Sequence, residues 1–82
     1  MIVKYQQVQQ QINKWDPIDL LIHTPQDEYE WEIQQIYRFV NSLPKPTKEA
    51  VGKKIYDIFS LSFGLTFNRS LSECISIAEK LW

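Results

Sequence analysis

The sequence predicts an all-α domain, an irregular bundle of four main helices plus one short helical turn. Apolar residues recur at three- and four-residue steps along most of its 82 residues, which is the period of a helix packed on one side. No stretch alternates apolar and polar residues for long enough to indicate a strand. With this length and 44% hydrophobic residues, we expect residues 1–82 to form one domain with one core.

The N-terminal part of the chain is expected to form a helix and then a short helical turn. The first helix covers residues 2–14, because apolar side chains recur there on one face: Tyr5, Val8, Ile12 and Trp15. Asp16 and Pro17 should end this helix, since proline disfavours helical geometry in the residue before it. The same pair can cap and start a short turn over residues 17–22.

A long helix is predicted over residues 25–42, with Thr24 as its cap. The acidic side chains of Asp27 and Glu28 would lie near the positive end of its dipole. At 100° per residue its apolar side chains fall along one line, which should face the core: Tyr29, Ile33, Ile36, Val40 and Leu43.

The next helix is predicted over residues 48–63, after two prolines and the capping residue Thr47. Its core-facing residues are Val51, Ile55, Ile58 and Phe59. Gly52 lies on the edge of this stripe and costs helix propensity, which indicates a close backbone approach as readily as simple tolerance. Gly64 is a candidate left-handed C-cap.

A terminal helix should start at Ser70, which forms a capping box with Glu73. Its apolar positions cover nearly half of the circumference: Leu71, Cys74, Ile75, Ile77, Ala78, Leu81 and Trp82. A stripe of this width predicts packing on two sides, so we expect this helix to be the central packing element, with Ile75 largely buried.

Charge and cysteine content exclude several classes of function. The formal net charge is −1, which disfavours binding to a nucleic-acid backbone. No apolar run is long enough to span a membrane, and the chain opens without the pattern of a secretory signal. A single cysteine rules out an internal disulfide. We therefore expect a cytoplasmic protein.

Acidic residues concentrate in residues 15–36, which contain six carboxylates and no Lys or Arg: Asp16, Asp19, Asp27, Glu28, Glu30 and Glu32. The other 60 residues carry nine basic and four acidic side chains. The sequence therefore predicts an acidic surface on an otherwise basic molecule. Such a surface would attract a partner with a basic surface.

No catalytic or metal-binding motif accompanies these carboxylates. A calcium loop needs a glycine turn, which residues 15–36 lack, and di-metal sites need Glu-x-x-His pairs, whereas His23 is the only histidine. We expect His23 to bond to backbone in a loop, and Cys74 to be a buried structural thiol. The sequence thus predicts neither a cofactor nor an enzyme.

Trp31 is the most informative single side chain, because it lies about 160° from the core stripe of its helix, on a polar face. A neighbouring segment could fold over it, or it could anchor an interface, since Trp beside Arg is typical of binding hot spots. Trp15, in contrast, continues the first apolar stripe and is expected in the core. The predicted partner-binding residues are Asp19, Glu28, Trp31, Gln35 and Arg38.

Several motifs resemble the YugE-like family of small uncharacterised helical proteins from bacilli. They are W-D-P-I-D-L at residues 15–20, P-Q-D-E-Y-E-W-E-I at 25–33, I-Y-D-I-F at 55–59, S-F-G at 62–64 and S-E-C-I-S-I-A at 72–78. This resemblance covers nearly the whole chain and implies an all-helical fold of about four main helices, with no assigned function. Some similar proteins resemble immunity partners of bacterial toxins.

Together these observations predict a non-enzymatic protein–protein interaction domain. Neutralising a toxin through the acidic face is one such role, with the partner offering a basic surface. The alternative from another class is a small-ligand or metal-binding helical domain, with the ligand held between helices.

Overall fold

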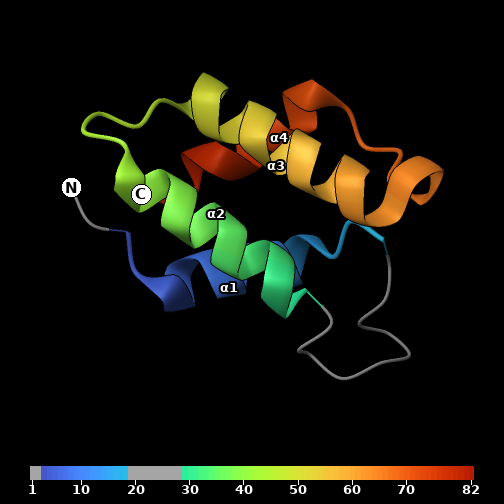
Figure 1. The fold of residues 1–82 in the computed structure, drawn as a ribbon, viewed down its shortest axis with the longest axis horizontal. Helices are drawn as coiled ribbons and strands as arrows, with labels where there is room; N and C mark the ends of the chain where they lie inside the picture. The colour runs from blue at the N-terminus through green and yellow to red at the C-terminus, as the bar shows by residue number, and fades with distance from the viewer. Residues whose placement is uncertain (1–2, 19–28) are drawn as a thin grey trace.

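The apolar periodicity of the sequence produces four helices and no strand in the computed structural model, which describes residues 3–18 and 29–82 (Figure 1). The all-α class is therefore confirmed. The elements, in chain order, are α1 (Tyr5–Trp15), α2 (Glu30–Ser42), α3 (Lys48–Phe63), a short 3-10 turn η1 (Gly64–Thr66) and α4 (Leu71–Glu79). None of the described helices is long and apolar enough to cross a bilayer.

The helix that occupies the centre of the bundle is α3, not the terminal helix. It packs against both α2 and α4, while α1 packs against α2 and also contacts α4. The expectation that the terminal helix is central was wrong, because α4 contains only nine residues. At the two ends of its wide apolar stripe, Leu71 and Trp82 are exposed. An apolar stripe therefore extends beyond the part that neighbouring helices cover.

The predicted helical phases of α2 and α3 are confirmed by burial. Both core stripes lie in the interior, at Tyr29, Ile33, Ile36, Val40, Val51, Ile55, Ile58 and Phe59. Leu43, at the end of the α2 stripe, is only partly buried. Ile75 is also partly buried rather than largely buried as expected.

Phe59 of α3 lies at the centre of an aromatic cluster. Its ring contacts Trp15, Tyr29, Phe63 and Phe67, with ring centroids 5.4 to 5.8 Å apart. Aromatic pairs at such distances add to the stabilisation from buried area alone. Trp15 is thus packed against the core as predicted, although its side chain is only partly buried.

Two predicted helix caps are confirmed. The Thr47 hydroxyl accepts a hydrogen bond from the backbone N–H of Ala50 (3.2 Å), and the Ser70 hydroxyl accepts one from that of Glu73 (3.1 Å). Each bond satisfies one of the N–H groups that the first turn of a helix leaves free. The caps therefore fix the starts of α3 and α4 where the sequence placed them.

Other predicted helix ends differ from the structure. The long helix α2 begins at Glu30 rather than at residue 25, because Tyr29 has φ −101° and ψ 14° and precedes it as a non-helical residue. The predicted cap at Thr24, and the turn over 17–22 beyond Ile18, lie outside the described residues. Gly64 ends α3 at a positive φ of 56°, but its ψ of −131° is not left-handed helical, and the chain continues into η1.

Gly52 makes the close backbone approach that its position on α3 indicated. A Cβ atom at this residue would lie 2.6 Å from Cγ1, 2.7 Å from Cα and 2.9 Å from the backbone nitrogen of Ile75. Contacts this short require something to move, and two of the three atoms belong to the backbone of α4. Glycine therefore allows α3 and α4 to pack at this distance.

An amide clamp, which the sequence did not reveal, holds the chain in front of α1. The Asn41 carbonyl oxygen Oδ1 accepts from the backbone N–H of Val3 (2.8 Å), and Asn41 Nδ2 donates to the Val3 carbonyl (2.9 Å). Val3 is buried as a result. The clamp ties the beginning of the chain to the end of α2.

Candidate functional site

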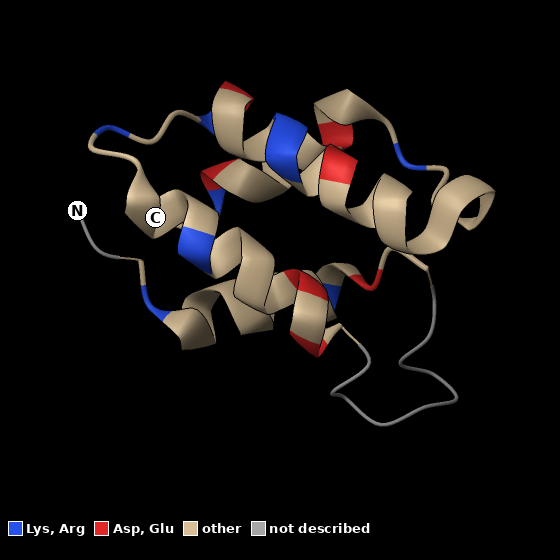
Figure 2. Cartoon of the chain, in the orientation of Figure 1, with Lys and Arg blue, Asp and Glu red and all other residues tan. Residues whose placement is uncertain are grey.

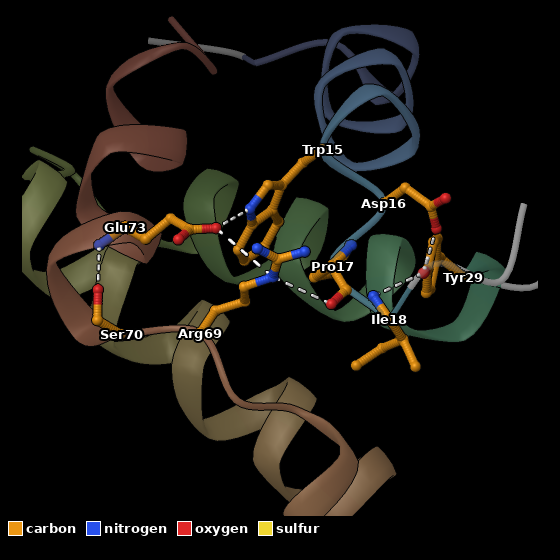
Figure 3. Close-up of polar contacts among 8 residues, drawn as sticks. All are labelled: Trp15, Asp16, Pro17, Ile18, Tyr29, Arg69, Ser70 and Glu73. Carbon is orange, nitrogen blue, oxygen red and sulfur yellow. Dashed lines mark hydrogen bonds and ion pairs between the residues drawn. The ribbon is translucent and has the colours of Figure 1, made fainter.

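The W-D-P-I motif forms the junction between α1 and the segment that follows it. Asp16 ends α1 in the left-handed region, with φ 45° and ψ 62°, and its backbone N–H donates to the Ile12 carbonyl. Its carboxylate accepts a hydrogen bond from the Tyr29 hydroxyl (2.6 Å), and the same hydroxyl accepts one from the backbone N–H of Ile18 (3.1 Å) (Figure 3). Asp16 is therefore the C-cap of α1, while its predicted role as the cap of the turn over residues 17–22 concerns a turn that lies largely outside the described residues.

A second polar network connects this junction to α4. The Trp15 indole N–H donates to the Glu73 carboxylate (2.5 Å), and Arg69 Nε donates to the Pro17 carbonyl (3.2 Å) while lying 3.7 Å from Glu73 Oε2 (Figure 3). The capping box expected for α4 thus has its Ser70 bond, but the Glu73 carboxylate accepts from Trp15. Sequence reasoning found Glu73 and missed its partner, which is 58 positions away.

These two networks give the W-D-P-I motif a structural role. Trp15 packs on Phe59 and Phe67 and also bonds to α4, while Asp16 and Ile18 are both tied to Tyr29. The carboxylate of Asp16 is therefore engaged in an intramolecular hydrogen bond with Tyr29. It does not belong to a free acidic surface.

Glu32 provides a second correction to the predicted acidic surface. Its side chain is only 6% exposed, and its Oε1 atom is buried with no hydrogen-bond partner among the residues that the structure describes. The helical phase accounts for this position, because Glu32 lies about 40° from Ile36 around the axis of α2. Counting charges along the chain ignores this angular position and therefore assigned Glu32 to the acidic surface.

The outward face of α2 carries three of the five predicted partner-binding residues. Trp31, Gln35 and Arg38 follow one another at steps of four and three residues, which places them along one line of a helix. Trp31 is 51% exposed and Arg38 is exposed, while Gln35 is partly buried. The described elements thus leave about half of Trp31 exposed, and the loop before α2, which is the other candidate cover, lies outside the described residues. The other two predicted residues, Asp19 and Glu28, lie outside the described residues.

Charges of both signs are interspersed over the described part of the chain, with ion pairs such as Lys48–Glu79 and Lys53–Asp57. Figure 2 shows basic residues near the start of α1, the second half of α2 and the connection to α3, where Lys4, Arg38 and Lys45 are exposed. The start of α2 lies towards the opposite end, where Glu30 is exposed. The outward face of α2 therefore runs from an acidic start to a basic Arg38, and its described part is mixed rather than purely acidic.

The remaining candidate groups have structural explanations. Cys74 is buried as predicted, and this burial, together with the nearby Glu73 carboxylate, raises the pKa of its thiol to about 12. It is therefore protonated at neutral pH and a poor nucleophile. Within residues 3–18 and 29–82, no group of three His, Cys, Asp or Glu side chains is placed to hold a metal ion. His23 is not among the described residues.

The fold and these contacts define a small all-helical domain, whose candidate site is an exposed tryptophan on the outer face of one helix. The chain belongs to the DUF1871 family, a domain of unknown function, whose model matches residues 7–82. That range includes nearly all of α1 and the whole of α2, α3 and α4, so the family corresponds to the complete bundle. No curated protein and no solved structure gave a significant match.

Proposed function

We propose that this chain is a non-enzymatic protein–protein interaction domain that binds its partner through the outward face of α2. The observation that carries this proposal is Trp31, which is 51% exposed on a helix face that it shares with Gln35 and Arg38. Tryptophan and arginine are enriched among residues that dominate binding energy. The exposed half of the side chain contributes nothing to folding, whereas its burial against a partner would remove that apolar area from water.

The partner that we propose offers a basic surface next to a pocket for the indole ring. Residues 15–36 contain no Lys or Arg, and although Asp16 bonds to Tyr29 and Glu32 is buried, Glu30 is exposed one position before Trp31. Asp19 and Glu28 are further proposed contributors from this segment. Opposite charges would steer the two proteins together and accelerate their association.

Neutralisation of a toxin in the cytoplasm is the biological role that we propose for this contact. The YugE-like resemblance of the motifs supports it by analogy, since some similar proteins resemble toxin immunity partners. A toxin with a basic surface would match the acidic segment in charge.

Photo-crosslinking from α2 would identify the partner. A photoreactive phenylalanine derivative at Gln35, on the same helix face as Trp31, should capture the partner in the source organism, and mass spectrometry would identify it. Surface plasmon resonance with that protein should then show binding about 30-fold weaker for Trp31→Ala, as expected for a hot-spot tryptophan worth about 2 kcal/mol. Glu30→Lys should mainly slow association, and added salt should do the same.

Trp82→Ala is the matched control, because Trp82 is also an exposed tryptophan, at 41%. This variant should bind like the wild type. Equal affinities for wild type and Trp31→Ala would disprove the α2 interface. Circular dichroism of each variant would verify that weaker binding does not come from unfolding.

A further inference from the structure

The buried carboxylate of Glu32, in the first turn of α2, is not used by the fold. Its side chain is only 6% exposed, and its Oε1 atom is buried with no hydrogen-bond partner among the described residues. None of the ion pairs formed by those residues includes Glu32. Removing a charge from water without giving it a partner is costly, so this carboxylate weakens the isolated domain.

A local role in α2 does not account for the charge. A glutamate at the third position of a helix can bond back to the N–H of the cap residue, but Oε1 of Glu32 makes no such bond. The helix dipole favours a negative charge in the first turn, and Glu30 supplies one there while remaining exposed to water. A neutral glutamine at position 32 would fill the same space without the cost of a buried charge.

Glu32 lies at the border between the core and the outward face of α2. Around the helix axis it is about 40° from Ile36, which is completely buried, and about 60° in the other direction from Gln35, which is partly buried. A glutamate side chain has staggered alternatives at its rotatable bonds, so a change of rotamer can bring the carboxylate to the outward face. Trp31, the residue before it, is half exposed on that face.

We propose that Glu32 accepts hydrogen bonds from an arginine side chain of the partner, which packs on the ring of Trp31. A guanidinium group is planar, so it can stack on an indole and donate two parallel hydrogen bonds to a carboxylate. It is also more weakly hydrated than an ammonium group and therefore suits a partly buried site. A metal ion does not fit, because the described residues offer no group of three ligands. This inference rests on the proposed function of α2 and identifies the basic group that its outward face recognises.

Titration with N-acetyl-arginine amide would test this site without the partner, and N-acetyl-citrulline amide is its neutral control of similar shape. In two-dimensional NMR spectra the indole N–H signal of Trp31, identified by its absence in Trp31→Phe, should shift with a dissociation constant of about 1 to 10 mM. Citrulline should cause no saturable shift. Glu32→Gln should weaken binding of the arginine probe about tenfold, because it removes a charge-assisted acceptor.

Glu30→Gln is the matched control, because it removes an exposed carboxylate on the other side of Trp31 in the chain. This variant should bind the arginine probe within about twofold of the wild type, as expected for an exposed charge. Chemical denaturation adds a second readout. Glu32→Gln should raise the urea midpoint, since it removes an unpaired buried charge, whereas Glu30→Gln should leave the midpoint nearly unchanged.

The arginine site would be overturned by the absence of a saturable Trp31 shift, or by an equal loss of binding in the two glutamine variants. A lower urea midpoint for Glu32→Gln would also overturn it, because the carboxylate would then serve the fold. With the partner captured through α2, equal affinities for wild type and Glu32→Gln would leave the α2 interface intact and refute the arginine contact. Equal affinities for wild type and Trp31→Ala would instead refute the proposed function.

Discussion

Replacing Gly52 with alanine tests how α3 and α4 pack. In an isolated helix this change would stabilise by about 1 kcal/mol, because glycine is a poor helix former. In the folded chain the added methyl group would lie 2.6 Å from Ile75 Cγ1, and 2.7 Å and 2.9 Å from its Cα and backbone nitrogen. The side-chain atom can move aside by rotation, but the two backbone atoms move only if α4 shifts away from α3.

Overpacking of a core typically costs about 1 to 3 kcal/mol and sometimes more. A contact with backbone belongs at the upper end of that range, so we expect a net destabilisation of about 1 to 2 kcal/mol after the propensity gain. In a domain of this size such a loss lowers the melting temperature by roughly 4 to 16 °C. Circular dichroism during a thermal scan would measure it.

Two further variants make the test specific. Ser62→Ala, on the exposed last turn of α3, controls for helix propensity and should leave the melting temperature unchanged or slightly raised. Gly52→Ala should remain destabilising when added to Ile75→Ala, because that background removes Cγ1 but keeps the two backbone atoms. A melting temperature for Gly52→Ala equal to or above that of the wild type would refute the close approach.

Three other predictions follow from burial and hydrogen bonding. Ile36→Ala should reduce the free energy of unfolding by about 2 to 5 kcal/mol, because Ile36 is completely buried; an unchanged urea midpoint would contradict its place in the core. Thr47→Ala and Ser70→Ala should each cost about 0.5 to 2 kcal/mol through loss of a capping bond, and silent variants in chemical denaturation would show that these hydroxyls do not cap. The free energy of unfolding should fall as the pH rises above 9, because the thiol of Cys74 ionises near 9.0 in the unfolded chain but has a pKa of about 12 in the folded protein. Cys74→Ala should lack that part of the loss, and identical pH profiles for the two proteins would refute it.

The sequence by itself determined the local architecture. Apolar residues at three- and four-residue steps place the core-facing sides of α2 and α3 correctly, and Thr47 and Ser70 mark the starts of two helices. These features depend on residues within one or two turns of each other, so a single sequence contains the information. The Gly52 contact was predicted only in part. A glycine within a helix indicated a close approach of another backbone, but the sequence did not identify Ile75 as the neighbour.

The tertiary structure decided which polar groups remain free for binding. Asp16 is occupied by Tyr29, and Glu73 by Trp15, in contacts between residues 13 and 58 positions apart. Glu32 is buried while Trp31, one position earlier, is half exposed. Charge counts and composition do not separate these neighbours, although helical phase does, because Glu32 lies about 40° from Ile36 and Trp31 lies on the opposite side. The exposure of Leu61, at the end of α3, and of Leu65, in η1, became visible only in the structure, because it depends on which elements pack around these residues.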